Sequence, residues 1–165
     1  ESNIIDNPRD NFNKLLSRLE VEEDIDWDEF KNIFHQASSD ISNKQVLLDQ
    51  RDSDGDTLLL CVCCMQPPKE IVQMIIDADP EMIRISSRNN YNCLHYSIMY
   101  NSSLDTVKYL VDAYPQAIID TTFDDRMTPL HMIQPITTLE VVEYIVETNT
   151  HVTAIRNKFY RTPLD

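Results

Sequence analysis

The chain has 165 residues, of which 42% are hydrophobic and 25% are charged. This balance suits one compact domain or one short repeat array with a real core. Its formal net charge of −14 at pH 7 repels phosphate backbones and anionic lipid headgroups, which argues against nucleic acid as the main partner. No apolar run approaches the roughly 20 residues that a membrane-crossing helix needs, so direct membrane insertion is not expected.

The negative charge is uneven along the chain. Residues 1–60 hold 15 acidic and 6 basic residues, so nine of the fourteen net negative charges lie in about the first third. One interpretation is that the acidity only keeps the protein in solution. The other is that the acidic end faces a basic partner.

The first fifty residues carry no repeated phrase but are patterned. Residues 1–9 are mostly polar, without the basic start and apolar run of a secretory signal, and we expect a flexible segment there. Residues 10–50 contain two apolar stripes with helical spacing, at Phe12, Leu15, Leu16 and Leu19 and at Trp27, Phe30, Ile33 and Phe34. The acidic stretch between them is expected to be exposed. We interpret residues 10–50 as acidic capping helices, because the end of a repeat array needs a water-facing side.

Two phrases recur along the rest of the chain. The first is TLLL at 57–60, then NCLH at 92–95, TPLH at 128–131 and TPLD at 162–165, with steps of 35, 36 and 34 between the central leucines. The second is EIVQMII at 70–76, DTVKYLV at 105–111 and EVVEYIV at 140–146, with two steps of 35. Two independent phrases that share one period indicate a repeat of about 35 residues.

Each repeat can be interpreted physically. An apolar run suited to a helix follows the first phrase, and an acidic residue opens the second helix, where it complements the helix dipole. Pro80 and Pro115 are expected to stop the second helices, and Asn101 and Asn149 lie where a short connection needs a left-handed residue. One such unit cannot bury its own apolar face, so neighbouring units must stack.

These phrases resemble the ankyrin repeat, whose consensus has a Gly-x-Thr-Pro-Leu-His turn and a Glu-Val-Val second helix. The resemblance covers residues from about 45 to 165, with TPLH at 128–131 as a full match. The family's glycine is kept at Gly55 and replaced by Asn90, Arg126 and Tyr160. The resemblance implies an all-α solenoid of helix pairs behind the N-terminal cap, with repeats at about 51–85, 86–120 and 121–155 and a partial one at 156–165. Because residue 165 lies just where the first helix of the fourth repeat should begin, we expect the 165 residues to be a fragment, or a C-terminal continuation to be unordered.

Cysteine, histidine and aspartate cluster locally, a pattern that suggests metal binding. Cys61 and Cys64 have the two-residue gap of a zinc pair, but Cys93 and His95 do not, and core packing is the favoured interpretation. The aspartates at 52–56 suggest a calcium loop. Placing Gly55 at its sixth position, however, puts non-acidic residues at both ends. No metal or cofactor is expected.

Catalysis has little support in the sequence. There is no nucleophile motif, and a chain with one glycine lacks a glycine-rich phosphate loop. His95 and His131 occupy the family's repeat position, where the resemblance implies a structural hydrogen bond between neighbouring turns. We expect a protein that is not an enzyme.

The resemblance instead implies binding of a partner protein through turn tips and first helices that line a concave face. The candidate residues are Asp54, Asp56, Arg88, Asn89, Tyr91, Tyr100, Asp124, Asp125, Met127, Lys158, Phe159 and Arg161. Tyr91, Met127 and Phe159 are expected to be exposed anchors, whereas Tyr100 could equally pack on a neighbouring helix. The mixed charges favour a partner with basic and apolar features.

The alternatives are a permanent structural subunit, or the regulatory or targeting segment of a larger enzyme or signalling protein. A regulatory module would be a monomer alone, whereas a permanent subunit would be unstable without its partner. The crowding of Cys61, Cys63 and Cys64 does not resemble a disulfide framework. Free thiols predict a reducing intracellular compartment, which is the cytoplasm, the nucleus or an organelle.

Overall fold

The computed structural model describes residues 8–20, 25–39 and 41–165. The predicted flexible segment falls outside these residues, apart from positions 8 and 9, which begin the first helix, and so does the middle of the predicted acidic stretch, at 21–24. Within the described residues the structure is entirely helical and has no strand. The all-α class is therefore confirmed.

The N-terminal helices are α1 (Pro8–Glu20), α2 (Trp27–Ala37) and α3 (Ile41–Asp49). The following elements are α4 (Leu58–Cys63), α5 (Lys69–Ala78), η1 (Pro80–Arg84), α6 (Cys93–Met99), α7 (Leu104–Ala113) and η2 (Pro115–Ile118). The chain then continues with η3 (Pro129–Met132), α8 (Leu139–Thr148) and η4 (Thr150–Ala154), where η denotes a short 3-10 helix.

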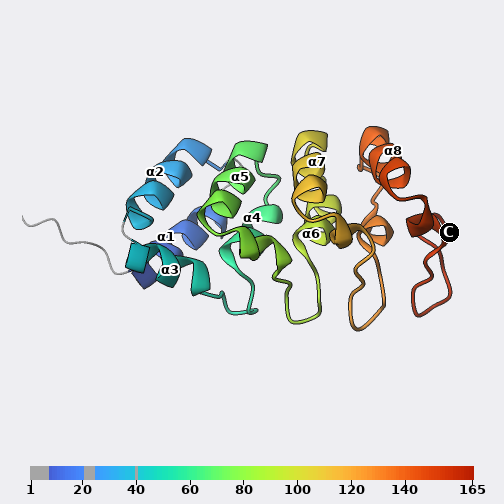
Figure 1. Cartoon of the computed structure of the whole chain (residues 1–165), viewed down its shortest axis with the longest axis horizontal. Coiled ribbons are helices and arrows are strands. Elements are labelled where there is room, and N and C mark those ends of the chain that lie inside the picture. Colours follow the sequence, from blue (N-terminus) through green and yellow to red (C-terminus); the bar gives the residue numbers. More distant parts are fainter. Residues whose placement is uncertain (1–7, 21–24, 40) are drawn as a thin grey trace, which may run out of the picture.

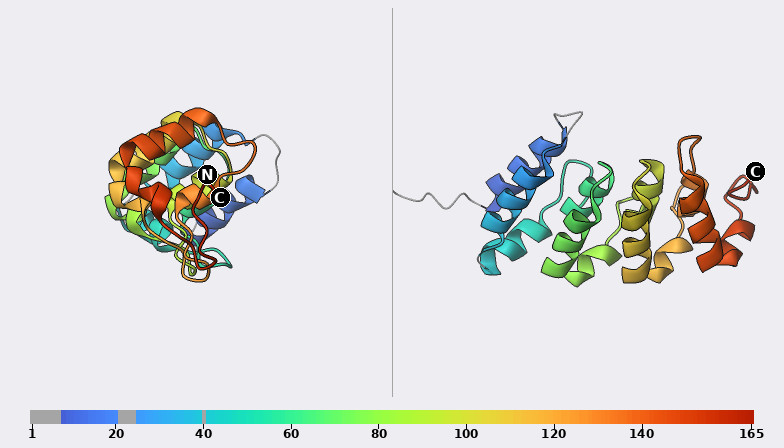
Figure 2. Two further views of the ribbon diagram at one scale, coloured as in Figure 1. Left: turned by 90° about the vertical axis from the view of Figure 1, so that its right-hand side faces the viewer. Right: turned by 90° about the horizontal axis from the view of Figure 1, so that it is seen from above.

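These elements form a row in which each helix packs on its counterpart one step along the chain (Figure 1). One line of contacts runs from α4 to α6 and then to η3, and another runs from α5 to α7 and then to α8. Seen along the row, the helices of successive segments overlie one another and the loops before α4, α6 and η3 project together at one edge (Figure 2). This arrangement places sequence positions about 35 residues apart side by side.

The two apolar stripes predicted for the N-terminal segment lie on α1 and α2. Phe12 and Leu15 on α1 are buried, as are Phe30, Ile33 and Phe34 on α2. The side chain of Leu19 lies outside the described residues. Neither predicted stripe covers α3, whose residues Leu47 and Leu48 are buried while Val46 is exposed.

The predicted helix boundaries are mostly confirmed. Glu70, Asp105 and Glu140 lie in the first turns of α5, α7 and α8, where a carboxylate meets the positive end of the helix dipole. Pro80 and Pro115 follow the ends of α5 and α7 and begin new 3-10 turns, since proline is tolerated at the first helical position. Asn101 has the expected left-handed backbone, with φ of 59°.

Two boundary predictions are wrong. Asn149 has an extended φ of −150°, and its side chain instead accepts a hydrogen bond from the His151 N–H at the start of η4. The run after the TPLH phrase forms only the four-residue η3. Pro135 explains the short helix, because it has no N–H to donate and disfavours the helical conformation of Gln134 before it.

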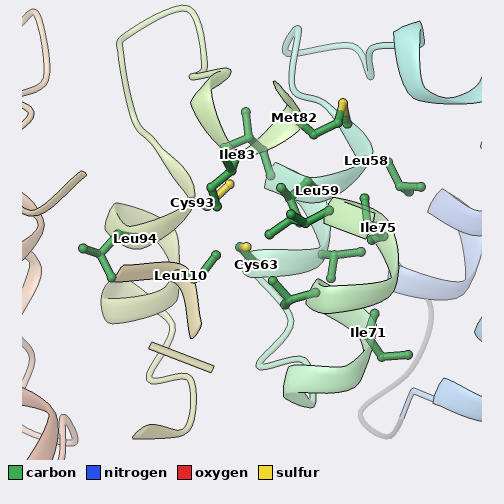
Figure 3. Close-up of a cluster of buried hydrophobic side chains, with 14 of the residues drawn as sticks. Leu58, Leu59, Cys63, Ile71, Ile75, Met82, Ile83, Cys93, Leu94 and Leu110 are labelled. Carbon is green, nitrogen blue, oxygen red and sulfur yellow. The ribbon is translucent and has the colours of Figure 1, made fainter. Parts of the chain in front are cut away.

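The core is continuous along the row, with side chains from α4, α5, η1, α6 and α7 meeting in one cluster (Figure 3). Leu59 and Cys63 of α4 are fully buried, and so are Ile71 and Ile75 of α5. Cys93 of α6 is 1% exposed. Burial of Cys63 and Cys93 among aliphatic side chains agrees with the packing role expected for these thiols.

Candidate functional site

Three loops precede α4, α6 and η3, and a fourth lies at 157–161. All four are closed by the same backbone hydrogen bond. The N–H of Asp52, Ser87, Thr122 and Asn157 donates to the carbonyl of Asp56, Tyr91, Met127 and Arg161, respectively, at 2.9–3.0 Å. The donors are spaced 35 residues apart throughout. The third loop spans one residue more between donor and acceptor, which accounts for the 36-residue step in the sequence phrase.

Each loop also has a left-handed residue before its closing carbonyl. Gly55 has φ of 88°, and Asn90, Arg126 and Tyr160 have φ of 61°, 55° and 63°. These are the positions at which the resemblance places the family's glycine. Glycine and asparagine adopt this conformation readily, whereas arginine and tyrosine do so at a cost.

The residue that donates the closing hydrogen bond contributes its side chain as well, a role that was not predicted. Asp52 Oδ1 accepts from the N–H groups of Asp54 and Asp56, at 2.9 and 2.8 Å. Asn157 Oδ1 makes the equivalent pair of bonds in the fourth loop, and the hydroxyls of Ser87 and Thr122 each accept one loop N–H. Short polar acceptors at steps of 35 were the signal in the sequence for this role.

Neighbouring loops are joined to one another. His95 Nδ1 accepts from the Asn92 N–H, which leaves Nε2 to donate to the Met127 carbonyl of the next loop, at 3.0 Å. His131 makes the same contact to the Arg161 carbonyl, at 3.2 Å. Burial lowers the pKa of His95 from 6.5 to about 4. Both histidines therefore have the structural role that the sequence predicted.

A cleft of about 300 Å³ lies where the first loop meets the first helices. We call it the acidic cleft. Its walls come from α1, the first loop, α4 with the residues that follow it, and α6, and its lining consists of Leu16, Asp52, Asp54, Asp56, Cys61, Cys64, Met65, Tyr96 and Tyr100. We use the name loop face for the surface formed by the four loops together with the outer sides of α4 and α6.

A tyrosine ladder, formed by Tyr91, Tyr96 and Tyr100, runs beside the acidic cleft. The rings of Tyr91 and Tyr96 stack, with centroids 5.5 Å apart and planes at 14°. Tyr96 and Tyr100 follow at 6.3 Å, and Tyr100 is 43% exposed. The ladder offers a partner both an aromatic surface and polar hydroxyl groups.

Asp56 has an unusual environment at the inner end of the cleft. Its carboxylate accepts a hydrogen bond from the Tyr96 hydroxyl at Oδ2, at 3.0 Å, while Oδ1 is buried and has no hydrogen-bond partner among the described residues. Burial raises the pKa of Asp56, and the charges of Asp52 and Asp54 add to this rise, while the Tyr96 hydrogen bond and Arg88 oppose it. An unpaired buried oxygen of this kind is costly.

The two thiols that line the cleft are not activated. Burial raises the pKa of Cys61, and the nearby Asp52 raises it further and accepts a hydrogen bond from the thiol at 3.4 Å. Burial also raises the pKa of Cys64, to about 12. A nucleophilic cysteine needs the opposite shift.

The predicted binding residues differ in accessibility. The exposed ones are Asp54, Arg88, Tyr100, Asp124, Lys158, Phe159 and Arg161, and the half-buried ones are Asn89, Tyr91, Asp125 and Met127. The expected exposure of Tyr91 and Met127 is therefore corrected to partial burial, because the Tyr91 ring packs on His95 and Tyr96. Asp56 is only 8% exposed, since its carboxylate turns inward to Tyr96.

The structure brings two groups of these residues together. Asp54, Asp56 and Tyr100 meet at the acidic cleft, and Lys158 forms an ion pair with Asp125 in the neighbouring loop. Asn89 joins the second and third loops, because its side-chain oxygen accepts from the Asp124 N–H at 3.0 Å. Arg88 lies against the first loop, with its side chain over Gly55.

A larger hollow of about 540 Å³ lies between α2 and α5, away from the predicted binding residues. It is lined by charges of both signs, including Lys31, Glu70 and Asp77. Unlike the acidic cleft, it contains none of the buried unpaired polar atoms found in the described residues. Size alone therefore does not make it the better candidate.

Within the described ranges, no group of three or more histidine, cysteine or acidic side chains is placed to hold a metal ion. None of the helices in that part of the chain is long and apolar enough to cross a membrane. No protein-family model matches the sequence, and no curated protein matches it.

Proposed function

We propose that this chain is a divergent ankyrin-type array that binds a partner protein through its loop face and does not catalyse a reaction. The observation that carries the proposal is the loop face itself. Four loops that share one closing hydrogen bond and a left-handed residue lie side by side next to the half-exposed tyrosine ladder. The left-handed residues at Asn90, Arg126 and Tyr160 support the family resemblance, because they occupy the positions of the consensus glycine.

The loop face is ordered before any partner arrives. Each loop is closed by its own hydrogen bonds, and His95, Asn89 and His131 connect one loop to the next. A surface that is already ordered loses little conformational entropy on association. Tyr100 and Phe159, which are 43% and 58% exposed, supply large side chains of the kind that anchor protein interfaces.

The titratable groups of the site favour binding over catalysis. The thiols of Cys61 and Cys64 have raised pKa values, and the ring nitrogens of His95 are occupied by backbone groups. A general base or nucleophile would need an accessible, activated group. We also infer an intracellular setting, because all four cysteines are free.

The proposal is tested with two matched triple variants. The loop-face variant carries Asp54→Ala, Tyr100→Ala and Phe159→Ala, all at exposed positions. The control variant carries Gln73→Ala, Lys108→Ala and Glu143→Ala, which are exposed at 35-residue steps on α5, α7 and α8. A partner captured from native lysate with the wild type is identified and purified, and its affinity for all three proteins is measured.

We expect the loop-face variant to bind this partner on the order of 100-fold more weakly, since each lost anchor costs about 1 kcal/mol. The control variant should bind like the wild type. Circular dichroism establishes that all three proteins are equally folded. Loss of binding in the control variant alone would place the interface on the second helices and contradict the proposal.

A second candidate function is a permanent subunit of a larger assembly. It is favoured by exposed large apolar side chains between positions 136 and 164, namely Ile136, Leu139, Phe159, Tyr160 and Leu164. Exposed apolar surface of this kind marks interaction sites. Sedimentation separates the candidates, because a permanent subunit would self-associate or aggregate when alone, whereas a reversible binding module would remain a monomer.

A further inference from the structure

We propose that the acidic cleft receives a positively charged side chain, arginine or lysine, from the partner protein. This inference rests on the proposed function, because it assigns the chemistry of one contact within the loop face. It depends on three features of the cleft, which are an unpaired buried carboxylate oxygen, a surplus of negative charge, and walls suited to an aliphatic stem.

The unpaired oxygen is Asp56 Oδ1. Asp56 is 8% exposed, and this oxygen has no hydrogen-bond partner among the described residues. The other oxygen accepts from the Tyr96 hydroxyl, and Asp56 and Tyr96 both belong to the lining of the cleft. A buried acceptor without a donor is costly, and a bound cationic donor would remove that cost.

The charges at the cleft are unbalanced. Asp52, Asp54 and Asp56 all line it, and none of the described residues in its lining is basic. Asp52 already accepts two loop N–H groups and the Cys61 thiol, whereas Asp54 is exposed at the rim. Among the described residues, the cation whose field acts on Asp56 is Arg88, and its side chain lies over Gly55, outside the lining. An incoming cation would therefore meet Asp54 first and Asp56 at the inner end.

The remaining walls suit the apolar part of a long basic side chain. Leu16 and Met65 are half-buried and contribute aliphatic surface, and the rings of Tyr96 and Tyr100 contribute aromatic surface. Arginine and lysine bury their methylene groups against such surfaces, and a cation near a tyrosine ring gains further attraction. A volume of about 300 Å³ is enough for one side chain and far too small for a folded element.

The test uses amide spectra of the isotopically labelled chain, titrated with small probes. The cationic probes are Nα-acetyl-arginine amide and Nα-acetyl-lysine amide, and the neutral probe is Nα-acetyl-norleucine amide, which keeps an aliphatic chain but has no charge. We expect both cationic probes to shift the signals of residues 52–65 and 94–100, with dissociation constants on the order of 10 mM. The neutral probe should leave these signals unchanged.

Three variants, each of which removes one negative charge, make the result specific. Asp56→Asn and Asp54→Asn should weaken binding of the cationic probes by about tenfold or more, while Glu143→Gln on α8 should leave it unchanged. Asp54 is exposed, so its variant keeps the test valid even if Asp56→Asn fails to fold. Equal binding of the neutral probe, or no shift with any probe at several times the expected dissociation constant, would overturn the proposal.

The experiments distinguish failure of the cation-binding proposal for the acidic cleft from failure of the proposed function. If a partner needs the loop face but binds Asp54→Asn and Asp56→Asn normally, the acidic cleft is not the cation site and the loop face remains the interface. If the probes bind as expected but no partner depends on the loop face, the cleft chemistry stands and the proposed function falls.

Discussion

Segments 86–120 and 121–155 begin alike and then diverge. Both start with a closed loop, a left-handed residue, and a capping box in which a histidine ring accepts from the backbone N–H of Asn92 or Thr128. The first then forms the seven-residue α6, whereas the second forms only the four-residue η3. The second helices of the two segments, α7 and α8, are both ten residues long.

The difference shows that a few local residues set the turn while a single proline sets the length of the helix. Pro135 occupies the position that corresponds to Met99 in α6, and it prevents a second helical turn. The complete helix carries Tyr96 and Tyr100 to the surface beside the first loop. The corresponding residues of the third segment are Met132 and Ile136, which offer no aromatic ladder. The acidic cleft therefore lies beside α6.

The largest difference in stability between the two segments should come from substitution of their histidines, His95 and His131. His95 is fully buried, so His95→Ala leaves a cavity and removes the hydrogen bonds that the ring makes to the Met127 carbonyl and the Asn92 N–H. We expect it to lower the free energy of unfolding by about 3 kcal/mol. His131 is half-buried, and His131→Ala should cost about 1 kcal/mol. Urea denaturation followed by circular dichroism measures both, and equal losses would contradict the difference in burial.

The difference in burial between His95 and His131 should also appear in the pH dependence of stability. The pKa of His95 is lowered from 6.5 to about 4 on folding, so the folded protein binds this proton less readily than the unfolded chain does. Its contribution to stability is therefore present above pH 6.5 and is lost as the pH falls towards 4. Between pH 7 and pH 5 the free energy of unfolding should fall by about 2 kcal/mol from this group.

Urea midpoints at pH 7 and pH 5 measure this loss in the wild type, His95→Gln and His131→Gln. Asp56, whose pKa is raised, acts in the opposite direction but is common to all three proteins. In His95→Gln, most of the fall in the free energy of unfolding between pH 7 and pH 5 should be absent. The pKa of His131 is also lowered by burial, but its ring is less buried. His131→Gln should therefore lose nearly as much stability between pH 7 and pH 5 as the wild type does. An unchanged pH dependence in His95→Gln would disprove the assignment.

The left-handed residues of the second and third loops, Asn90 and Arg126, should respond differently to substitution by glycine. Arg126→Gly relieves a φ of 55° and should raise the free energy of unfolding by about 1 kcal/mol. Asn90→Gly should lower it by a similar amount, because the Asn90 amide donates to the Thr121 carbonyl at 2.8 Å and asparagine already tolerates this conformation. Opposite signs in thermal denaturation are the expected result, and equal signs would contradict it.

The smallest effect is expected at Pro135. Pro135→Ala restores an N–H and should let η3 extend by part of a turn, with a change in stability within about 0.5 kcal/mol because the site is exposed. Carbon chemical shifts of residues 132–136 would report the added helix. Unchanged shifts would show that packing, and not the proline, limits the helix.

The sequence predicted the all-helical class and the second helices, because both depend on short-range patterns that repeat, whereas the role of the histidines was implied by the family resemblance. The sequence missed α3, where Val46 is exposed and no clear apolar stripe marks the helix. It overestimated the exposure of Tyr91 and Asp56. Their burial depends on contacts with Tyr96, and in the case of Asp56 this contact joins residues 40 positions apart. The acidic cleft also depends on long-range packing, since its walls come from three separate parts of the chain, which are α1, residues 52–65 and residues 96–100.

The most direct test of the central claim, that the loop face binds a partner, is hydrogen exchange of the wild-type protein with and without the captured, purified partner. The account predicts new protection of backbone amides in 52–65 and 87–100, together with the later loops near 124 and 159. Protection confined to the second helices α5, α7 and α8 would contradict it.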